Sequence, residues 1–253
     1  MISFSLQSGS NGNSIYVEAG NVRLLFDAGI CGSEAERRLA THGRDIRRVD
    51  AVIVSHDHAD HIRHAGVYER KFGLPLFITQ KTLREAQKKI KLGPLKRVHH
   101  FMAGGTLDFG TVSVHTIPTP HDGADGVVFV LDSGGKRLGI LTDLGHVFDG
   151  LPQLVPTLDG VFLESNYDPA MLEHGPYPAF LKNRIKGPHG HISNGEAAEL
   201  LREGKNLQWA CLAHLSEKNN YPRIALDTHR KILSDTLDLH IAGRHQTTAL
   251  LKL

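Results

Sequence analysis

The chain has 253 residues, a formal net charge of +2, and ordinary fractions of hydrophobic (40%) and charged (22%) residues. These values are typical of a soluble globular protein, and the mildly basic balance permits an acidic partner without requiring one. No apolar run is as long as a membrane span, so we expect no membrane partner. The first residues lack the basic and apolar regions of a secretion signal, which predicts a cytoplasmic protein. Cys31 and Cys211 lack metal-type spacing and are expected to be free thiols.

The N-terminal quarter of the chain predicts a β-meander followed by a helix. Alternating or continuous apolar residues indicate strands over 2–6, 15–17 and 22–26. A loop rich in glycine, serine and asparagine, Ser8–Ser14, separates the first two strands, and it is either a wide turn near a site or a phosphate-binding loop. Ser33, followed three residues later by Glu36, predicts a helix over 33–42 with Ser33 as its N-cap.

The densest chemistry in the chain directly follows a short apolar strand. Val52–Val54 has the composition of a strand buried on both faces, and a His-x-His-x-Asp-His motif comes next. Packing does not explain this loop, because crowded imidazoles and carboxylates repel one another or need water. His56 and His58 are spaced to hold one divalent ion, and Asp60 and His61 to face a second. Such ligands suit zinc, manganese or iron.

The rest of the chain alternates helices and strands in two β-rich halves. We predict helices over 63–72, 81–92, most of 168–203 and 222–233, and strands over 74–79, 98–102, 112–117, 127–131, 138–141, 161–163 and 207–212. Two short strands follow the last helix. No linker and no repeat of 20–50 residues is evident. The pattern therefore predicts one domain over residues 1–253, an α/β (α+β) fold of two stacked sheets with helices outside.

Three further candidate ligands each follow a predicted strand. His121 comes after the strand over 112–117, Asp143 after the strand over 138–141, and His214 after the strand over 207–212. Open sheets bind ligands outside the ends of their strands. The three side chains are therefore expected to meet the histidine motif in one crevice.

The order of these residues resembles that of the metallo-β-lactamase superfamily, and the resemblance covers essentially the whole chain. It implies a four-layer αβ/βα sandwich of two mixed sheets with helices outside and a dinuclear site between the sheets. The implied ligands are His56, His58 and His121 on one ion, Asp60, His61 and His214 on the other, and Asp143 bridging both.

Two later segments are similar to the RNase Z-type phosphodiesterase branch of that superfamily. Phe162–Asn166 and Gly190–Ala198 match its glutamate and histidine segments, in which a Glu/His pair helps to protonate the leaving oxygen. Together with Tyr177–Ile185 and His214–Asn220, they resemble still more closely the WalJ/YycJ proteins, small bacterial members associated with 5′-to-3′ exonuclease action on DNA. The resemblance implies catalytic roles for the residues Glu164, His191 and the ligand Asp60.

The chemistry of these residues also suits phosphodiester hydrolysis. Two divalent ions outweigh the charges of Asp60, Asp143 and a bridging hydroxide, so the site favours an anionic substrate, and the hydroxide is the expected nucleophile. His191 precedes a helix whose start is marked by a capping box over 193–196, and the positive end of a helix suits phosphate. Glu164, if close, keeps His191 protonated as the proton donor.

Cations outside the motif are candidates for binding a polynucleotide, with DNA favoured over RNA. The preferred set leads into His191 and consists of Lys182, Arg184 and Lys186, and a second set on the helix over 81–92 consists of Lys81, Arg84, Lys88 and Lys89.

Two other functions remain open. A small-molecule metallo-hydrolase acting on a cyclic phosphodiester, lactone or thioester would share every ligand. A non-catalytic metal-binding regulatory module would need neither a bridged ion pair nor a proton donor.

Overall fold

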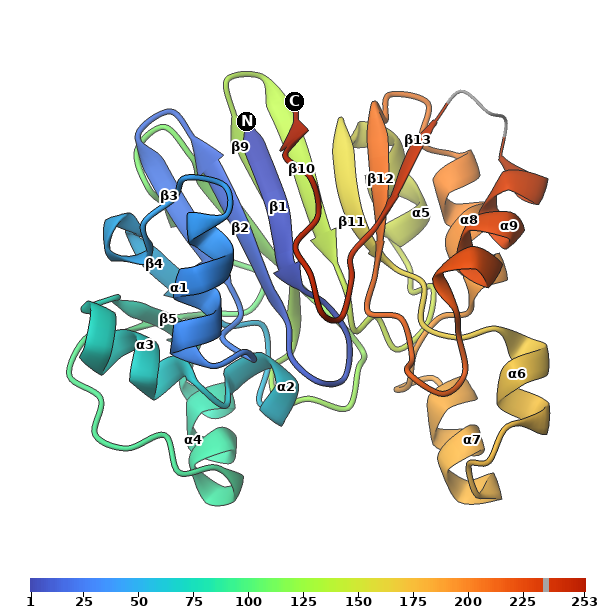
Figure 1. Ribbon diagram of the computed structural model, residues 1–253, viewed down its shortest axis with the longest axis horizontal. Helices are drawn as coiled ribbons and strands as arrows, with labels where there is room; N and C mark the ends of the chain where they lie inside the picture. The colour runs from blue at the N-terminus through green and yellow to red at the C-terminus, as the bar shows by residue number, and fades with distance from the viewer. Residues whose placement is uncertain (234–236) are drawn as a thin grey trace.

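The strands form two seven-stranded sheets in the computed structural model, which describes residues 1–233 and 237–253 (Figure 1). The first sheet contains, in spatial order, β14 (Leu251–Lys252), β1 (Ile2–Gln7), β2 (Ser14–Ala19), β3 (Val22–Phe26), β4 (Ala51–Ile53), β5 (Leu76–Thr79) and β6 (Val98–Phe101). The second contains β13 (Asp238–Ile241), β12 (Trp209–Ala213), β11 (Gly160–Glu164), β10 (Lys136–Leu141), β9 (Val127–Ser133), β8 (Ser113–Pro118) and β7 (Thr106–Asp108).

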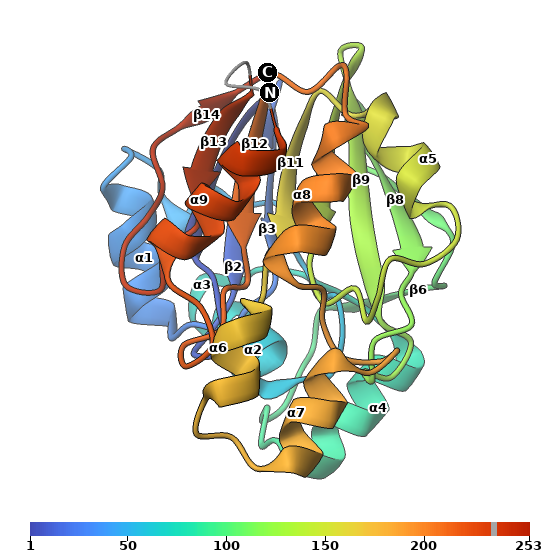
Figure 2. The same ribbon diagram turned by 90° about the vertical axis from the view of Figure 1, so that its right-hand side faces the viewer.

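Helices cover the outer faces of both sheets. Those on the side of the first sheet are α1 (Gly32–Ala40), α2 (Ala59–Ile62), α3 (Ala65–Phe72) and α4 (Gln80–Lys89). Those on the side of the second sheet are α5 (Leu151–Leu154), α6 (Pro169–His174), α7 (Ala179–Lys186), α8 (Asn194–Arg202) and α9 (Pro222–Ile232), of which α8 and α9 face the viewer in Figure 2. Short 3-10 turns lie at Ile46–Arg48 and Val155–Thr157. The predicted four-layer sandwich is confirmed.

Three buried apolar layers hold the sandwich together. The inner faces of the two sheets meet in a central layer, where the rings of Phe26 and Phe129 lie 5.0 Å apart and those of Phe162 and Trp209 lie 5.4 Å apart. A second layer packs the first sheet against α1 and α3, and a third packs the second sheet against α5, α8 and α9. Burial of apolar area in these layers is the main force that positions the strand ends.

The parallel strands bring the predicted site residues to one edge. β3 to β6 run parallel to one another, as do β10 to β13, and the remaining pairs are antiparallel. In Figure 1 the ends of β1, β11 and β12 and the helix α2 all lie toward the lower edge. The loop after β4 carries the histidine motif, and the loops after β8, β10 and β12 carry His121, Asp143 and His214, so the topology places these residues together.

The structure corrects two predicted helices. α1 begins at Gly32 with Cys31 as N-cap, so Ser33 lies inside the helix and makes no cap. The acid in the first turn is Glu34, which pairs with Arg37 at 2.5 Å instead of completing a capping box. The helix predicted over 63–72 is two helices, α2 and α3. The break occurs because the backbone N–H of His64 donates to the carbonyl of Ala28, 2.9 Å away in a neighbouring loop.

The described helices are short. The longest, α9, has 11 residues, and none of those in the described ranges is long and apolar enough to cross a membrane. Cys31 is an exposed free thiol, and Cys211 is a buried one within β12, where burial raises the pKa of the thiol.

Candidate metal centre

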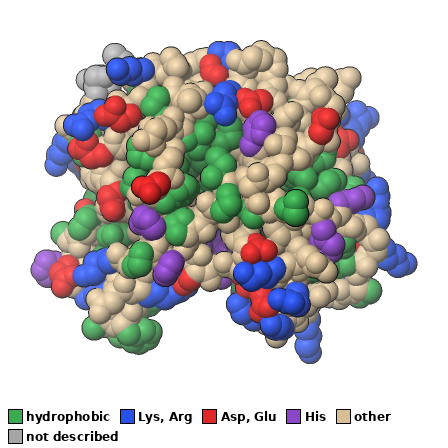
Figure 3. Space-filling model, turned by 180° about the vertical axis from the view of Figure 1, so that it is seen from behind, with side chains coloured by type: hydrophobic (Ala, Val, Ile, Leu, Met, Phe, Trp, Pro, Cys, Tyr) green, Lys and Arg blue, Asp and Glu red, His purple; other side chains and the backbone are tan. Residues whose placement is uncertain are grey.

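The site lies at the lower edge of the sandwich, between two projecting parts of the molecule. One projection is α4, and the other is formed by α6 and α7 (Figure 1). Seen from behind, the surface is hollowed between them, with histidine side chains in the hollow and lysine and arginine side chains on both sides (Figure 3). This hollow is where the loops after the parallel strands end.

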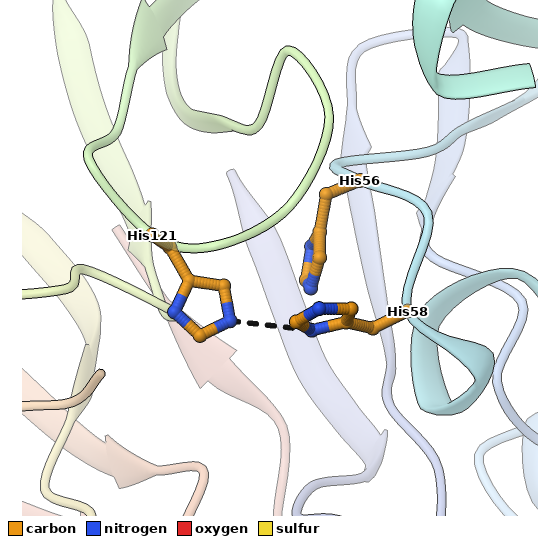
Figure 4. A group of neighbouring side chains, drawn as sticks. All are labelled: His56, His58 and His121. Carbon is orange, nitrogen blue, oxygen red and sulfur yellow. Dashed lines mark hydrogen bonds between the residues drawn. The ribbon is translucent and has the colours of Figure 1, made fainter. Parts of the chain in front are cut away.

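The first group of candidate ligands consists of His56, His58 and His121, whose rings turn toward one another (Figure 4). One ligand atom from each lies within 4.8 Å of those of the other two. Nδ1 of His121 donates to the carbonyl of Gly190, 2.8 Å away, because a carbonyl only accepts. Its Nε2 therefore keeps a lone pair for a metal ion.

The other two histidines of this group are oriented in the same way by their neighbours. Ser55 Oγ donates to Asp27, so Nδ1 of His56, 2.9 Å from that hydroxyl, carries a hydrogen and leaves Nε2 as the ligand atom. Nε2 of His58 lies 3.2 Å from Asp122 Oδ1, which makes Nδ1 the ligand atom there. Nδ1 of His58 and Nε2 of His121 are 3.2 Å apart.

The second group consists of Asp60, His61 and His214, again with one ligand atom from each within 4.8 Å of the others. Asp60 Oδ2 lies 3.5 Å from Nε2 of His61 and 3.4 Å from Nε2 of His214. Asn13 closes this side, since its amide nitrogen is 3.2 Å from Asp60 Oδ2 and 3.0 Å from His61 Nε2. Asn166 supports His214, donating to its carbonyl at 2.8 Å.

Asp27 orients His61 of the second group. Its Oδ2 accepts from Nδ1 of His61 at 2.7 Å, and its Oδ1 accepts from the backbone N–H and the hydroxyl of Ser55 at 2.8 and 2.9 Å. This contact fixes the ring of His61 with Nε2 directed at the cluster. The contact agrees with the metal-supporting role that such carboxylates have beside ligating histidines.

Loss of Asp27 should weaken metal binding without removing a ligand. We expect Asp27→Ala to lower metal affinity about 10- to 100-fold, and Asp27→Asn to lower it less because the amide oxygen still accepts from His61. Titration of chelator-treated protein with Zn²⁺ or Mn²⁺ by calorimetry measures the change. Asp50→Ala, which removes an exposed aspartate, serves as the control. Equal metal affinities in the wild-type protein and in all three variants would contradict the supporting role of Asp27.

Asp143 lies between the two groups. Its Oδ1 is 3.6 Å from Nε2 of His121 in the first group, and its Oδ2 is 3.3 Å from Nε2 of His61 in the second. Among the described residues, two buried atoms of the cluster, His56 Nε2 and Asp143 Oδ2, have no hydrogen-bond partner. Buried polar atoms without partners are costly, so an ion between these groups would satisfy both atoms. The donor set fits divalent metal.

The backbone is strained at the same place. Within residues 1–233 and 237–253, the non-glycine residues with positive φ are Asp27 (66°), Asp125 (48°), Asp143 (59°) and His214 (53°). Non-glycine residues avoid this region unless the surroundings hold them there, and such residues concentrate at functional sites. Three of the four lie in the cluster.

The charges of the cluster depend strongly on one another. Burial lowers the pKa of His56 well below its ordinary value, which keeps the ring neutral as a ligand must be. Burial alone would raise the pKa of Asp143, but His214, His61 and the other histidines outweigh it and hold that pKa well below the ordinary value. Asp143 is therefore a carboxylate, able to bind a cation on both oxygens.

The predicted Glu/His pair is formed beside both groups. Glu164, fully buried at the end of β11, accepts from Nδ1 of His191 at 2.5 Å and from the backbone N–H of Leu144 at 3.0 Å. Burial opposes a charge on His191, but Glu164 outweighs it and raises the pKa of the imidazole. The His191 ring lies 5.0 Å from that of His121 and 5.3 Å from that of His214.

The helix after His191 is built as predicted. Ser193 is the N-cap of α8, its hydroxyl accepts from the backbone N–H of Glu196, and the Glu196 carboxylate accepts from the backbone N–H of Ser193. This reciprocal pair ends the loop that carries His191, so the position of the imidazole is set from both sides.

A cavity of about 160 Å³ opens over the cluster. Of the three cations predicted on α7 to bind substrate, one lines this cavity and two do not. Arg184 lines this cavity together with His191 and His214, and its guanidinium holds Asp122 at 2.7 Å. Lys182 and Lys186 do not line it. Lys182 donates to the carbonyl of Glu173 at 2.5 Å, and Lys186 pairs with the Glu173 carboxylate at 3.1 Å.

The cations of α4 face elsewhere or are paired. Lys81 and Arg84 line a separate groove of about 510 Å³ between α4 and His100 of β6. Lys88 pairs with Glu85 of its own helix at 2.7 Å. Lys89 reaches the loop of the first group and pairs with the buried Asp57 at 2.7 Å, so it fastens α4 to that loop.

Three residues of the site were not predicted as site residues. Asn13 contacts Asp60 and His61, Asp122 joins His58 to Arg184, and Asn166 holds His214. The only signal for Asn13 was the glycine- and asparagine-rich loop, which the structure places beside the second group. Nothing in the pattern around Asn166 indicated its contact, because its partner is 48 positions away.

Comparisons with known proteins agree with this geometry. Residues 22–214 match the family described as the beta-lactamase superfamily domain. Exodeoxyribonuclease WalJ of Streptococcus pneumoniae (serotype 2, strain D39) is 34% identical over 224 residues, which cover 87% of this chain and 83% of that protein. Exodeoxyribonuclease YycJ of Bacillus anthracis is 32% identical over 232 residues, which cover 91% of this chain and 88% of that protein.

Solved structures share the fold at low identity. The metallo-β-lactamase fold protein YhfI from Bacillus subtilis superimposes with a TM-score of 0.75 at 16% identity, covering 98% of this chain and 100% of that one. Zn²⁺-bound PqqB from Methylobacterium extorquens has a TM-score of 0.72 at 16% identity, with the same coverage. The chain therefore belongs to the beta-lactamase superfamily and has the metallo-β-lactamase fold predicted from its sequence.

Proposed function

We propose that this metal-dependent hydrolase is a phosphodiesterase that degrades DNA from an end, in the 5′-to-3′ direction. One observation carries the proposal: the fully buried Glu164 holds the partly buried His191 directly beside two groups of candidate metal ligands, both of which Asp143 contacts. A proton donor next to a cationic centre is what cleavage of a phosphodiester with an alkoxide leaving group requires. The two exodeoxyribonuclease relatives, which align over most of their length, support the choice of DNA.

The chain's own residues would hold two divalent ions. His56, His58 and His121 form one set, Asp60, His61 and His214 form the other, and Asp143 contacts both. Histidine and carboxylate together suit zinc or manganese, and iron also fits. When bound, the ions supply Lewis-acid stabilisation of the phosphate charge and lower the pKa of a water molecule.

His191 would protonate the departing sugar oxygen. Glu164 holds Nδ1, so the hydrogen on Nε2 is the one available to a substrate in the 160 Å³ cavity that His191 lines. The Glu164 carboxylate stabilises the imidazolium, and the buried setting makes that ion pair strong. His191 thus moves a proton while the ligand residues hold the charge of the phosphate.

Arg184 would bind a phosphate of the strand at the mouth of the cavity. It is the one cation of the predicted set that lines the cavity. Its present partner is Asp122, which also lies 3.2 Å from Nε2 of His58 and holds the guanidinium over the first group. A planar guanidinium binds phosphate through two parallel hydrogen bonds. Arg184 is therefore suited to exchange the Asp122 carboxylate for a phosphate of the strand.

A substrate panel tests the proposed function. End-labelled single-stranded DNA, RNA of the same sequence and a cyclic nucleotide are each incubated with protein loaded with Mn²⁺ or Zn²⁺, and with chelator-treated protein. We expect DNA to be shortened by the loaded protein alone. Cleavage of the cyclic nucleotide without cleavage of either polymer would instead favour the small-molecule hydrolase, and saturable metal binding with no hydrolysis would favour the regulatory module.

The role of Arg184 gives a second expected result. Each phosphate contact that is lost should flatten the plot of log affinity against log salt by about 0.7 for single-stranded DNA. Arg184→Ala is therefore expected to weaken DNA binding and to reduce this slope, measured in chelator to prevent cleavage. Lys186→Ala is the matched control on the same helix, because its partner is Glu173 and it does not line the cavity. Equal slopes in wild type and Arg184→Ala would exclude this contact.

A further inference from the structure

A second cavity, of about 390 Å³, lies next to the cavity over the metal centre. One wall is the segment from Leu215 to Pro222, which follows the candidate ligand His214, and the other is the segment from Ile241 to Gln246, which follows β13. Leu215 and Ser216 line both cavities, so the two spaces are adjacent across these residues. A group that occupies the larger cavity is therefore a neighbour of whatever occupies the smaller one.

The first wall is held rigidly to the metal centre by Asn220. This buried amide donates to the carbonyls of Ser165 and Asn166 at 2.9 and 3.0 Å, and its oxygen accepts from the backbone N–H of Tyr221 at 3.0 Å. Asn166 in turn holds His214, and its carbonyl accepts from the backbone N–H of Ser216 at 2.8 Å. The position of Tyr221 is thus coupled to that of a candidate metal ligand.

The second wall is tied to the loop that carries Asn13. Arg244 donates to the carbonyl of Leu215 at 2.5 Å and to Asn11 Oδ1 at 3.1 Å. The carbonyl of Gly243 accepts from the backbone N–H of Ser8 at 3.1 Å. Both walls are therefore built before any ligand binds, which lowers the entropic cost of occupying the space between them.

The surface of this cavity suits a flat, largely apolar group. Leu215, Pro222, Ile241 and Ala242 supply apolar surface. Tyr221 stands at the edge with 60% of its surface exposed, and it is one of three large hydrophobic side chains in the described ranges that are mostly exposed, with Met102 and Phe180. An exposed aromatic ring beside an apolar cavity offers a face on which a planar ring stacks.

The charges at this cavity disfavour a phosphate. Glu217 lines it with an exposed carboxylate, and the guanidinium of Arg244 is already bound to Leu215, Asn11 and the hydroxyl of Ser10. An anion would meet the Glu217 charge, and the guanidinium of Arg244 already directs donors at three neutral acceptors of the protein. A neutral ring with polar edges would instead find Ser216 and Gln246 as hydrogen-bond partners at the rim.

We propose that this cavity is a nucleobase subsite, which receives the base of the nucleotide next to the scissile phosphate and stacks it on Tyr221. The inference rests on the proposed function, because it assumes that the phosphate of a nucleic acid lies over the metal centre. A base reaches the subsite only after leaving its stack, which costs least at a single-stranded end. The subsite would therefore favour single-stranded termini over duplex interior.

Chromogenic esters test the subsite separately from the polymer. The two p-nitrophenyl esters of thymidine 5′- and 3′-monophosphate carry one base on opposite sides of the phosphate, whereas methyl p-nitrophenyl phosphate carries none. For one of the two isomers, Tyr221→Ala should lower the ratio of kcat/KM on the nucleoside ester to kcat/KM on the methyl ester by about 5- to 150-fold, as expected for the loss of one base-stacking contact. Tyr221→Phe keeps the ring and should keep the ratio.

Controls distinguish the possible failures. Met102→Ala removes an exposed apolar side chain that lines neither cavity and should leave the ratio unchanged. A wild-type preference for nucleoside esters that survives in Tyr221→Ala would overturn the subsite and leave the proposed function intact. A wild-type protein that hydrolyses the methyl ester but neither nucleoside ester nor DNA would overturn the proposed function itself. As a binding readout, DNA with a terminal 2-aminopurine should lose its stacking-dependent change in fluorescence with metal-free Tyr221→Ala.

Discussion

Protein in which Asp143 is replaced by alanine is expected to lose metal from both ligand groups. Asp143 contacts His121 in the first group and His61 in the second, so its carboxylate reaches both groups. Because loss of a supporting residue alone lowers metal affinity about 10- to 100-fold, loss of a shared ligand should exceed that at both sites. Hydrolysis should fall with occupancy. Metal content of protein purified without chelator, and calorimetric titration with Zn²⁺ or Mn²⁺, measure the effect.

A matched control removes an aspartate from a neighbouring strand of the same sheet. Asp132 lies on β9, pairs with Arg137 and His115 at the surface, and is remote from the ligand groups. Asp132→Ala should keep wild-type metal content. Two ions bound to Asp143→Ala with wild-type affinity would contradict the bridging role, and loss of only one ion would assign Asp143 to a single group.

Replacement of His191 by alanine should leave the metal content unchanged and lower kcat on DNA by about 10²- to 10⁴-fold, the usual contribution of a general acid. The loss should shrink on an ester with a p-nitrophenolate leaving group, because that group departs without a proton. Steady-state kinetics on both substrate types measure the difference. Equal losses on the two substrates would show that His191 positions the substrate instead of protonating it.

Two further variants sharpen the assignment of the proton donor. Glu164→Gln keeps an acceptor for the backbone N–H of Leu144 but removes the charge that favours the His191 imidazolium, so we expect a smaller fall than in His191→Ala. His174→Ala removes an exposed histidine at the end of α6, whose only described hydrogen bond is to the carbonyl of Ala170, and should retain wild-type kcat.

The meeting of the candidate ligands at one edge was predictable because its signal is local. The His-x-His-x-Asp-His motif follows a buried strand, and His121, Asp143 and His214 each follow another, so strand topology alone brings them to one edge. The capping box at Ser193 is equally local, and the structure confirms it. The local pattern fails at the start of α1, where Glu34 and Glu36 are both candidates for the acid of the first turn. Glu34 occupies the first turn and pairs with Arg37, and the cap predicted at Ser33 does not form.

The contacts that refine the site depend on tertiary packing and carry little signal in the sequence. Lys182, Arg184 and Lys186 are equivalent as residues of a basic helix, and only the rotation of α7 separates them. That rotation is set by the burial of Ile185, which turns Arg184 toward the cavity and Lys182 and Lys186 toward Glu173. The contact of Asn13 with Asp60 likewise depends on tertiary packing, because the two residues are 47 positions apart in the sequence.

The most direct test of metal-dependent DNA degradation from an end compares two substrates of identical sequence. Linear and covalently closed circular single-stranded DNA are incubated with Mn²⁺-loaded protein and with chelator-treated protein, and the products are separated by length. We expect loaded protein to shorten the linear strand progressively from its 5′ end, to leave the circle intact, and to lose this activity in chelator. Cleavage of the circle at a rate equal to that of the linear strand, or degradation that continues without metal, would contradict the account.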